Sequence, residues 1–296
     1  MKVKEKENFA EIPDGFRAVT VGSGAPGVDL KRGNPSTLVQ YRDRYFLVDC
    51  GYGTCRTLTE LGLGISRIRN VLFTHQHEDH NADFGHFLVA GWYDVKNGRK
   101  SINIVGPQVQ LLYEDTYEIF EDDIKGRIDV GARQGAGVTA EGISENVHIH
   151  DIGSSEYSLE LDGIRIDMHQ VLHGNMLSYA YRFSAGGGSV VVTGDLAYTA
   201  DLADFCRDAD ILVIDAMTMT GYFSKFTEEM IERSMGGTHM TQRQMGALLA
   251  DCRAKNVILT HIGGEFIDFD ATVKYFESAG YEGKVYGACD GFSLEL

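Results

Sequence analysis

The chain has 296 residues, of which 43% are hydrophobic and 24% charged, a composition typical of a globular protein with a sizeable core. Its 27 Lys and Arg stand against 43 Asp and Glu, and the formal charge of −16 disfavours a general nucleic-acid binder because such a surface repels phosphate. No apolar run reaches the roughly 18 residues of a membrane span, and segment 1–8 lacks the apolar region of a secretory signal. The five cysteines form no CxxC pair, so we expect a reducing, cytoplasmic location.

Strand and helix patterns alternate along the first part of the chain. Residues 17–21, 36–41 and 44–49 are predicted strands separated by turns rich in Gly and Pro. Residues 54–61 have helical spacing, and 70–75 form an apolar run typical of a strand that is covered on both faces. This alternation favours an α/β fold.

The second part of the chain repeats this plan. Further strands are predicted at 163–169, 178–183, 189–193, 210–215 and 256–261, and helices at 200–208 and 242–255. We therefore expect one domain over 1–296, built from two sheet-plus-helix halves of about 15–125 and 155–296 that pack as a four-layer αββα sandwich. The Gly-rich, weakly periodic segment 125–146 is predicted to be a long surface loop or lid.

A group of metal-binding residue types follows the predicted strand 70–75, in the sequence THQHEDH. While the chain is extended, His75 and His77 project to the same side, because strand side chains alternate. Asp79 and His80 follow as the chain turns and can face a second point. Imidazole nitrogens and a carboxylate suit Zn²⁺, Mn²⁺ or Fe²⁺, so the segment predicts a metal site.

Three more candidate ligands stand where an apolar strand meets a glycine-containing loop. His173 and Asp195 each adjoin a glycine, and His261 ends the predicted strand 256–261. Sites in α/β proteins gather at such strand ends. Because one cluster cannot saturate two metal ions, we expect these three residues to complete the site.

The HxHxDH pattern at 75–80, followed in order by His173, Asp195 and His261, resembles the metallo-β-lactamase-fold hydrolase superfamily, and Asp49-Cys-Gly matches the turn that precedes the motif there. The resemblance covers about residues 17–292 and implies an αββα sandwich with two divalent metal ions, zinc ahead of Mn or Fe. It implies one ion held by His75, His77 and His173, the other by Asp79, His80 and His261, and Asp195 bridging both along with a water or hydroxide. Asp49 would orient one of these ligands.

Within the superfamily the chain is most similar to the branch of ribonuclease Z, arylsulfatases and phosphodiesterases. The similarity rests on the segments VGSGAP at 21–26, PST at 35–37 and GTHMT at 237–241. In ribonuclease Z a histidine at the position of His239 helps to protonate the leaving group. The resemblance therefore makes His239 and the ligand Asp79 the candidate catalytic residues.

Other members of the superfamily fit less well. Asp195 disfavours a true β-lactamase, and His77 disfavours an oxygen-reducing flavodiiron protein. The tRNA-gripping arm of ribonuclease Z is inserted between the positions of His173 and Asp195, where this chain has only 21 residues, enough for a strand hairpin. Together with the charge of −16, this disfavours tRNA maturation.

The leading hypothesis is a dinuclear metal-dependent hydrolase of a small ester, with a phosphodiester or an aryl sulfate favoured. The alternatives are a lactone or carboxylic-ester hydrolase, a ribonuclease Z-like RNA endonuclease, and a non-catalytic, metal-containing regulatory protein that binds a ligand. Trp92, Tyr198 and Tyr222 are expected to line the substrate pocket. The expected partner is a small ester, without a membrane or nucleic acid, and a homodimer is left open.

Overall fold

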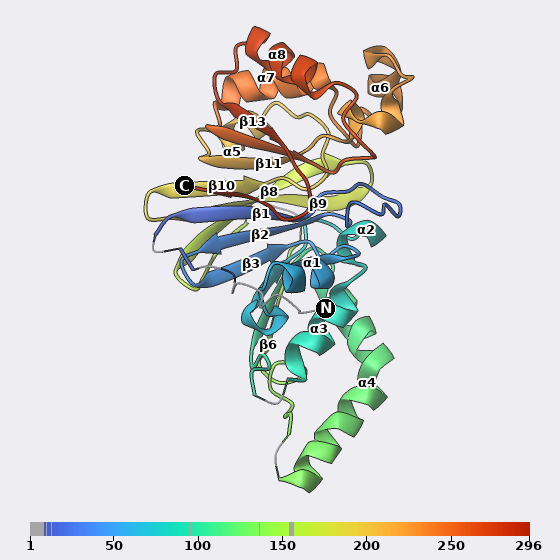
Figure 1. Cartoon of the computed structure of the whole chain (residues 1–296), viewed down its shortest axis with the longest axis vertical. Coiled ribbons are helices and arrows are strands. Elements are labelled where there is room, and N and C mark those ends of the chain that lie inside the picture. The colour runs from blue at the N-terminus through green and yellow to red at the C-terminus, as the bar shows by residue number, and fades with distance from the viewer. Residues whose placement is uncertain (1–8, 10, 13, 95, 136, 154–156) are drawn as a thin grey trace, which may run out of the picture.

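The computed structural model describes residues 9, 11, 12, 14–94, 96–135, 137–153 and 157–296, so the segment 1–8 lies outside the described residues. Two seven-stranded sheets face each other, and helices cover their outer surfaces (Figure 1). Each sheet joins an antiparallel part to a parallel part, and the parallel strands are those followed by helical crossovers.

The first sheet has the strand order β14-β1-β2-β3-β4-β5-β6. Its strands are β1 (Phe16–Gly22), β2 (Ser36–Tyr41), β3 (Arg44–Val48), β4 (Asn70–Leu72), β5 (Ile102–Gly106), β6 (Val147–Asp151) and β14 (Phe292–Glu295). The last strand, β14, returns to pair with β1 in antiparallel register. Residues 292–295, from the predicted second half, thus complete the first sheet.

The second sheet has the order β13-β12-β11-β10-β9-β8-β7. Its strands are β7 (Tyr157–Leu161), β8 (Ile164–His173), β9 (Met176–Ala185), β10 (Gly188–Val192), β11 (Ile211–Asp215), β12 (Asn256–Thr260) and β13 (Lys284–Gly287). The whole interval between His173 and Asp195 is occupied by the β9–β10 hairpin and its short turns, as expected from its length.

Three hydrophobic clusters define the layers. One lies between the sheets and joins residues of both, such as Phe46 and Phe183. A second packs the outer face of the first sheet against α1 (Thr54–Glu60), α3 (Phe84–Trp92) and α4 (Val109–Gln134). A third packs the second sheet against α5 (Leu202–Cys206), α7 (Gln242–Cys252) and α8 (Phe269–Ser278). The order helix, sheet, sheet, helix confirms the predicted four-layer αββα sandwich (Figure 1).

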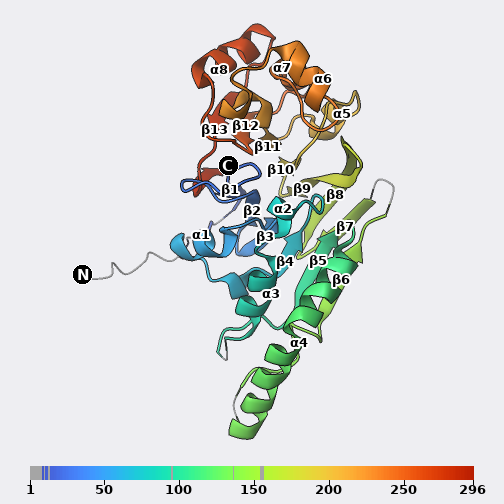
Figure 2. The ribbon, with the colours of Figure 1, turned by 90° about the vertical axis from the view of Figure 1, so that its right-hand side faces the viewer.

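Helix α4 projects away from the sandwich in both views (Figures 1 and 2), and it corrects the first part of the predicted loop over 125–146, because residues 125–134 belong to the helix. Gly126 and Gly131 weaken its helical pattern, but Lys125 and Arg127 pair with acidic residues one turn earlier. A side chain at 131 would collide with the backbone of Gly137, which explains the glycine there. The helix carries seven acidic and three basic residues, so its net charge is negative.

None of the helices in the described part of the chain is both long and apolar enough to cross a bilayer.

The candidate ligands gather at one edge of the sandwich, where the two sheets meet. His75 follows β4, His173 ends β8, Asp195 follows β10 and His261 follows β12. The short helix α2 (Glu78–Asn81) marks this edge and faces the viewer in Figure 2. The smaller elements α6 (Glu228–Met235), η1 (Ile65–Arg67), η2 (Met217–Met219) and η3 (Gly221–Phe223) complete the fold.

Candidate metal centre

The first cluster of possible ligands consists of His75, His77, His173 and Asp195. One nitrogen or oxygen atom of each lies within 4.8 Å of the others. Nδ1 of His77 lies 2.9 Å from Nε2 of His75 and 3.2 Å from Nε2 of His173, so three imidazole nitrogens converge on one point. The chain is extended at His77 and turns into α2 directly afterwards, which sends the next two candidates to a second point.

The second cluster consists of Asp79, His80 and His261, all buried. Nε2 of His261 lies 3.5 Å from Oδ2 of Asp79, and Nε2 of His80 lies 3.7 Å from the same oxygen. The two clusters share a neighbour in Asp195. Its Oδ2 lies 3.2 Å from Nε2 of His261, 3.5 Å from that of His80 and 3.9 Å from that of His173.

The donor atoms of the second cluster are without partners inside the described protein. Oδ2 of Asp79 and the Nε2 atoms of His80 and His261 are buried and make no hydrogen bond with any described residue. Burying such atoms unpaired costs about 1–3 kcal/mol each. Imidazole nitrogens and carboxylate oxygens in this proximity form a donor set that suits a divalent cation, so the residues present fit a metal.

Several groups outside the clusters orient these side chains. The Asp49 carboxylate accepts a hydrogen bond from Nδ1 of His80 at 2.8 Å. Nδ1 of His173 donates to the carbonyl of Thr238 at 2.9 Å. Nδ1 of His261 lies 3.4 Å from Oδ1 of Asp215 without hydrogen-bond geometry, a contact that the sequence interpretation missed. In each case the contact engages the far side of the ring and turns Nε2 towards the cluster.

His239 lies beside the clusters, and Asp215 holds it there. The ring of His239 stacks on His261 with centroids 5.7 Å apart and meets His173 edge-on at 5.3 Å. Its Nδ1 donates to Oδ2 of Asp215 at 2.6 Å. Burial lowers the pKa of His239, but the Asp215 carboxylate more than offsets this, so the net pKa is raised. Burial raises the pKa of Asp215, whereas His239 lowers it, and the result is a pKa of about 2.

Asp215 could have been found from the sequence, because it ends an apolar strand in the same way as the predicted ligands. The apolar run before it forms β11, which is buried throughout and lies between β10 and β12. The strands on either side lead to Asp195 and His261. A carboxylate at that position is therefore brought to the site by its neighbours in the sheet.

Of the three residues expected to line the pocket, Trp92 lies elsewhere in the structure. Its side chain is fully buried at the end of α3, and its indole N–H donates to the carbonyl of Thr139 at 2.8 Å. Because α3 turns that face towards the outer core of the first sheet, Trp92 packs there and not at the pocket rim. Tyr198 and Tyr222 are 39% and 53% exposed, and the ring of Tyr222 lies against Gly263, two residues beyond His261.

The position of Trp92 yields a test. The change Trp92→Phe should lower the free energy of unfolding by about 1–3 kcal/mol, because the smaller ring leaves a gap in the buried core around Trp92 and the hydrogen bond from the indole N–H to the carbonyl of Thr139 is lost. Chemical denaturation measures this loss, and hydrolysis per folded molecule should not change. The exposed aromatic change Tyr157→Phe should alter neither quantity. Loss of turnover at unchanged stability would restore Trp92 to the pocket.

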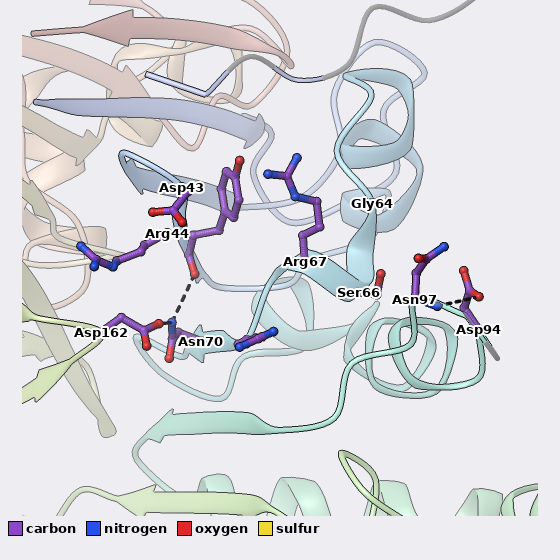
Figure 3. Close-up of a pocket in the computed structure, with 11 residues that line it drawn as sticks. Asp43, Arg44, Gly64, Ser66, Arg67, Asn70, Asp94, Asn97 and Asp162 are labelled. Atoms are coloured by element: carbon purple, nitrogen blue, oxygen red, sulfur yellow. Dashed lines mark hydrogen bonds between the residues drawn. The ribbon is translucent and has the colours of Figure 1, made fainter. Parts of the chain in front are cut away.

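A separate cavity of about 710 Å³ lies at the start of β3 and β4, at the ends of these strands away from His75 (Figure 3). Three arginines and three aspartates line it, so its charges balance. Asn70 donates there to Asp162 at 2.8 Å and towards the carbonyl of Tyr45. None of the residues that line this cavity belongs to the His and Asp clusters, so the two clusters remain the stronger candidate for the functional site.

The fold agrees with comparisons to known proteins. A family model described as "Beta-lactamase superfamily domain" matches residues 44–262, most of the chain. The chain therefore belongs to the β-lactamase superfamily and, with its fold and clusters, is a hydrolase of the metallo-β-lactamase fold. It lies in the ribonuclease Z-like branch: it is 32% identical to the ribonuclease Z of Mycobacterium bovis (strain BCG / Pasteur 1173P2) over 196 residues, which are 65% of this chain and 67% of that protein.

Two solved structures have the same fold. The metallo-beta-lactamase fold protein YhfI from Bacillus subtilis is 21% identical, with a TM-score of 0.71 over 96% of this chain and 100% of that one. The short form of human tRNase Z is 18% identical, with a TM-score of 0.69 over 94% of this chain and 98% of that one. The ribonuclease names among these relatives conflict with the expectation, drawn from net charge, that nucleic acid is excluded as a partner.

Proposed function

We propose that the chain holds two divalent metal ions, preferentially zinc. One ion is assigned to His75, His77 and His173, the other to Asp79, His80 and His261, and Asp195 to both. The observation that carries this proposal is the set of buried, unpaired donor atoms around the Asp195 carboxylate. Five of the seven assigned ligands are histidines and two are carboxylates, which favours Zn²⁺ over Mn²⁺ or Fe²⁺, although all three accept such ligands.

When bound, two such ions supply a nucleophile from water at neutral pH and neutralise charge on the reacting ester oxygen. The protein's own contribution is positional. Asp49 orients His80, and the carbonyl of Thr238 orients His173. Asp79 belongs to the second cluster, where its carboxylate can also align the attacking water.

His239 is assigned the role of proton donor to the leaving oxygen. Because Asp215 accepts the hydrogen on Nδ1, Nε2 is the nitrogen left to transfer a proton to substrate. The same Asp215 carboxylate stabilises the charged ring, in agreement with the raised pKa of His239. Tyr198 and Tyr222 are assigned as substrate contacts at the rim, since both are partly exposed.

The substrate we propose is a small phosphodiester, with an aryl sulfate second. A ribonuclease cleaves phosphodiester bonds, so the ribonuclease Z relatives support this bond type. The absence of an RNA-gripping arm between His173 and Asp195, where the structure has only the β9–β10 hairpin, argues for a small substrate. The projecting helix α4 is acidic and repels a polyanion.

A ribonuclease Z-like endonuclease is the second candidate, because the relatives in this branch carry that name. The basic residues near the site do not support it. Lys31 pairs with Glu265, and Arg32 donates to the carbonyls of Gly264 and Ala288. The side chain of Arg32 is only 10% exposed, so it ties the rim together and is not presented to a phosphate backbone.

The test is a metal titration of metal-free protein with four substrates: bis(4-nitrophenyl) phosphate, 4-nitrophenyl sulfate, an aliphatic lactone and a precursor tRNA. We expect phosphodiester turnover to be absent after chelation and to reach its maximum at two Zn²⁺ per chain. Faster cleavage of precursor tRNA than of the small diester would favour the endonuclease, and preference for the lactone would move the function to carboxylic esters. Two tightly bound ions without turnover of any substrate would favour a regulatory binding protein.

A further inference from the structure

Thr74 lies between the two clusters and touches both. It is 1% exposed, directly precedes His75, and follows β4 by two residues. Its backbone N–H donates to Oδ1 of Asp49 at 2.8 Å, and its hydroxyl lies 2.9 Å from Oδ2 of Asp49. The same hydroxyl lies 3.0 Å from Nδ1 of His75. Nδ1 of His80 lies 3.5 Å from that hydroxyl, so Asp49, His75 and His80 all meet at the Thr74 hydroxyl oxygen.

The directions of these hydrogen bonds follow from counting protons. A carboxylate only accepts, so the single hydroxyl proton of Thr74 points to Asp49. Nδ1 of His75 must then be the donor in its contact with the Thr74 oxygen, which leaves Nε2 of His75 without a proton and facing His77. Asp49 acts in the same way on His80, because it accepts directly from Nδ1 of that ring.

We infer that Thr74 is a positioning residue: its hydroxyl links the Asp49 carboxylate to Nδ1 of His75 by hydrogen bonds. One carboxylate thereby sets the imidazole tautomer of a histidine in each of the two metal clusters. The inference rests on the metal centre proposed above. Asp49 reaches the second cluster directly through His80 and the first cluster only through the Thr74 hydroxyl. The two clusters therefore differ in how they depend on these residues.

The second sheet holds Thr74 in place. The backbone N–H of Tyr179, on β9, donates to the Thr74 carbonyl at 2.9 Å. Gly194 packs against the Thr74 side chain so closely that a Cβ at that position would lie 2.6 Å from Cβ of Thr74. Gly194 adjoins Asp195, the residue shared by the clusters. Contacts from both sheets therefore fix the position of the Thr74 hydroxyl.

The test compares Thr74→Val, which keeps the shape but removes the hydroxyl, with Thr74→Ser, which keeps the hydroxyl. Zn²⁺ affinities of the metal-free proteins are measured by competition with a chromophoric chelator. We expect Thr74→Val to weaken one of the two sites about 10- to 100-fold and Thr74→Ser to match the wild type. Asp49→Asn should weaken both sites. Thr20→Val, which removes a buried threonine hydroxyl elsewhere, should weaken neither.

Wild-type affinities in Thr74→Val, or equal losses in the Ser and Val variants, would overturn the inference. A second measurement needs no variant. In the metal-free wild type, ¹⁵N NMR of the imidazoles should find the proton of His75 on Nδ1, and a proton on Nε2 would be decisive against the assignment. If the wild type itself fails to bind two ions, the proposed centre fails, whereas the NMR result still decides the role of Thr74.

Discussion

The change Asp195→Asn should reduce hydrolysis at least about 10³-fold, or roughly 4 kcal/mol of transition-state stabilisation, and should remove metal as well. The reason is its position. A single carboxylate oxygen lies within 3.9 Å of donor atoms from both clusters. An amide at that point keeps the volume but removes the negative charge that two divalent ions require. Metal content by mass spectrometry and turnover of bis(4-nitrophenyl) phosphate measure the two losses together.

The matched control is Asp115→Asn, at an exposed position on α4 far from the clusters along the chain. It makes the same chemical change and should leave metal content and turnover at wild-type levels. Thermal unfolding of the Asp195→Asn protein separates loss of the site from loss of the fold. A folded Asp195→Asn protein with two ions and wild-type turnover would contradict the assignment of Asp195 to both ions.

The change His239→Ala should slow hydrolysis of a phosphodiester with an alcohol leaving group by about 10²–10⁴-fold, while two ions per chain remain bound. An alkoxide needs a proton as it departs, and His239 is the ring that Asp215 holds beside the clusters. A 4-nitrophenolate leaving group needs little protonation, so the same variant should lose much less activity on bis(4-nitrophenyl) phosphate. Comparing kcat on the two substrates, with metal analysis, checks this expectation.

The control for this change is His86→Ala, at an exposed histidine on α3, which should affect neither substrate. Asp215→Asn should follow His239→Ala in its substrate preference, with a smaller loss, because the ring stays but its orienting carboxylate is gone. Equal losses on both substrates, or loss of an ion from the His239→Ala protein, would mean that His239 serves the metal centre and not the leaving group.

Predictions from the sequence agreed best with the structure where a side-chain pattern is compatible with only one kind of secondary structure. The strand at 36–41 is buried along its whole length, and the helix beginning at Gln242 follows a capping box formed by Thr241 and Gln244. The apolar runs that precede the candidate ligands also indicated that these residues stand at strand ends. In the folded chain all seven lie in two adjoining clusters.

The predictions failed where long-range packing overrides local pattern. Helix α4 contains Gly126 and Gly131, which lower helical propensity, but its inner face packs on the core of the first sheet. Trp92 was expected to line the pocket, but α3 turns it into the outer core of the first sheet. Strand β14 closes the first sheet from the far end of the chain, through a pairing that no local pattern encodes.

The charge of −16 and the HxHxDH segment were already enough to indicate an acidic protein with a histidine-rich metal site, because residue type and spacing carry that information. Which nitrogen of each ring faces the site was decided only by the tertiary structure. Asp215 reaches His239 from another strand, and Asp49 reaches His80 and, through Thr74, His75. These contacts join residues up to 31 positions apart, so they exist only after the strands have paired, and the orientation of the donors depends on the assembled sheets.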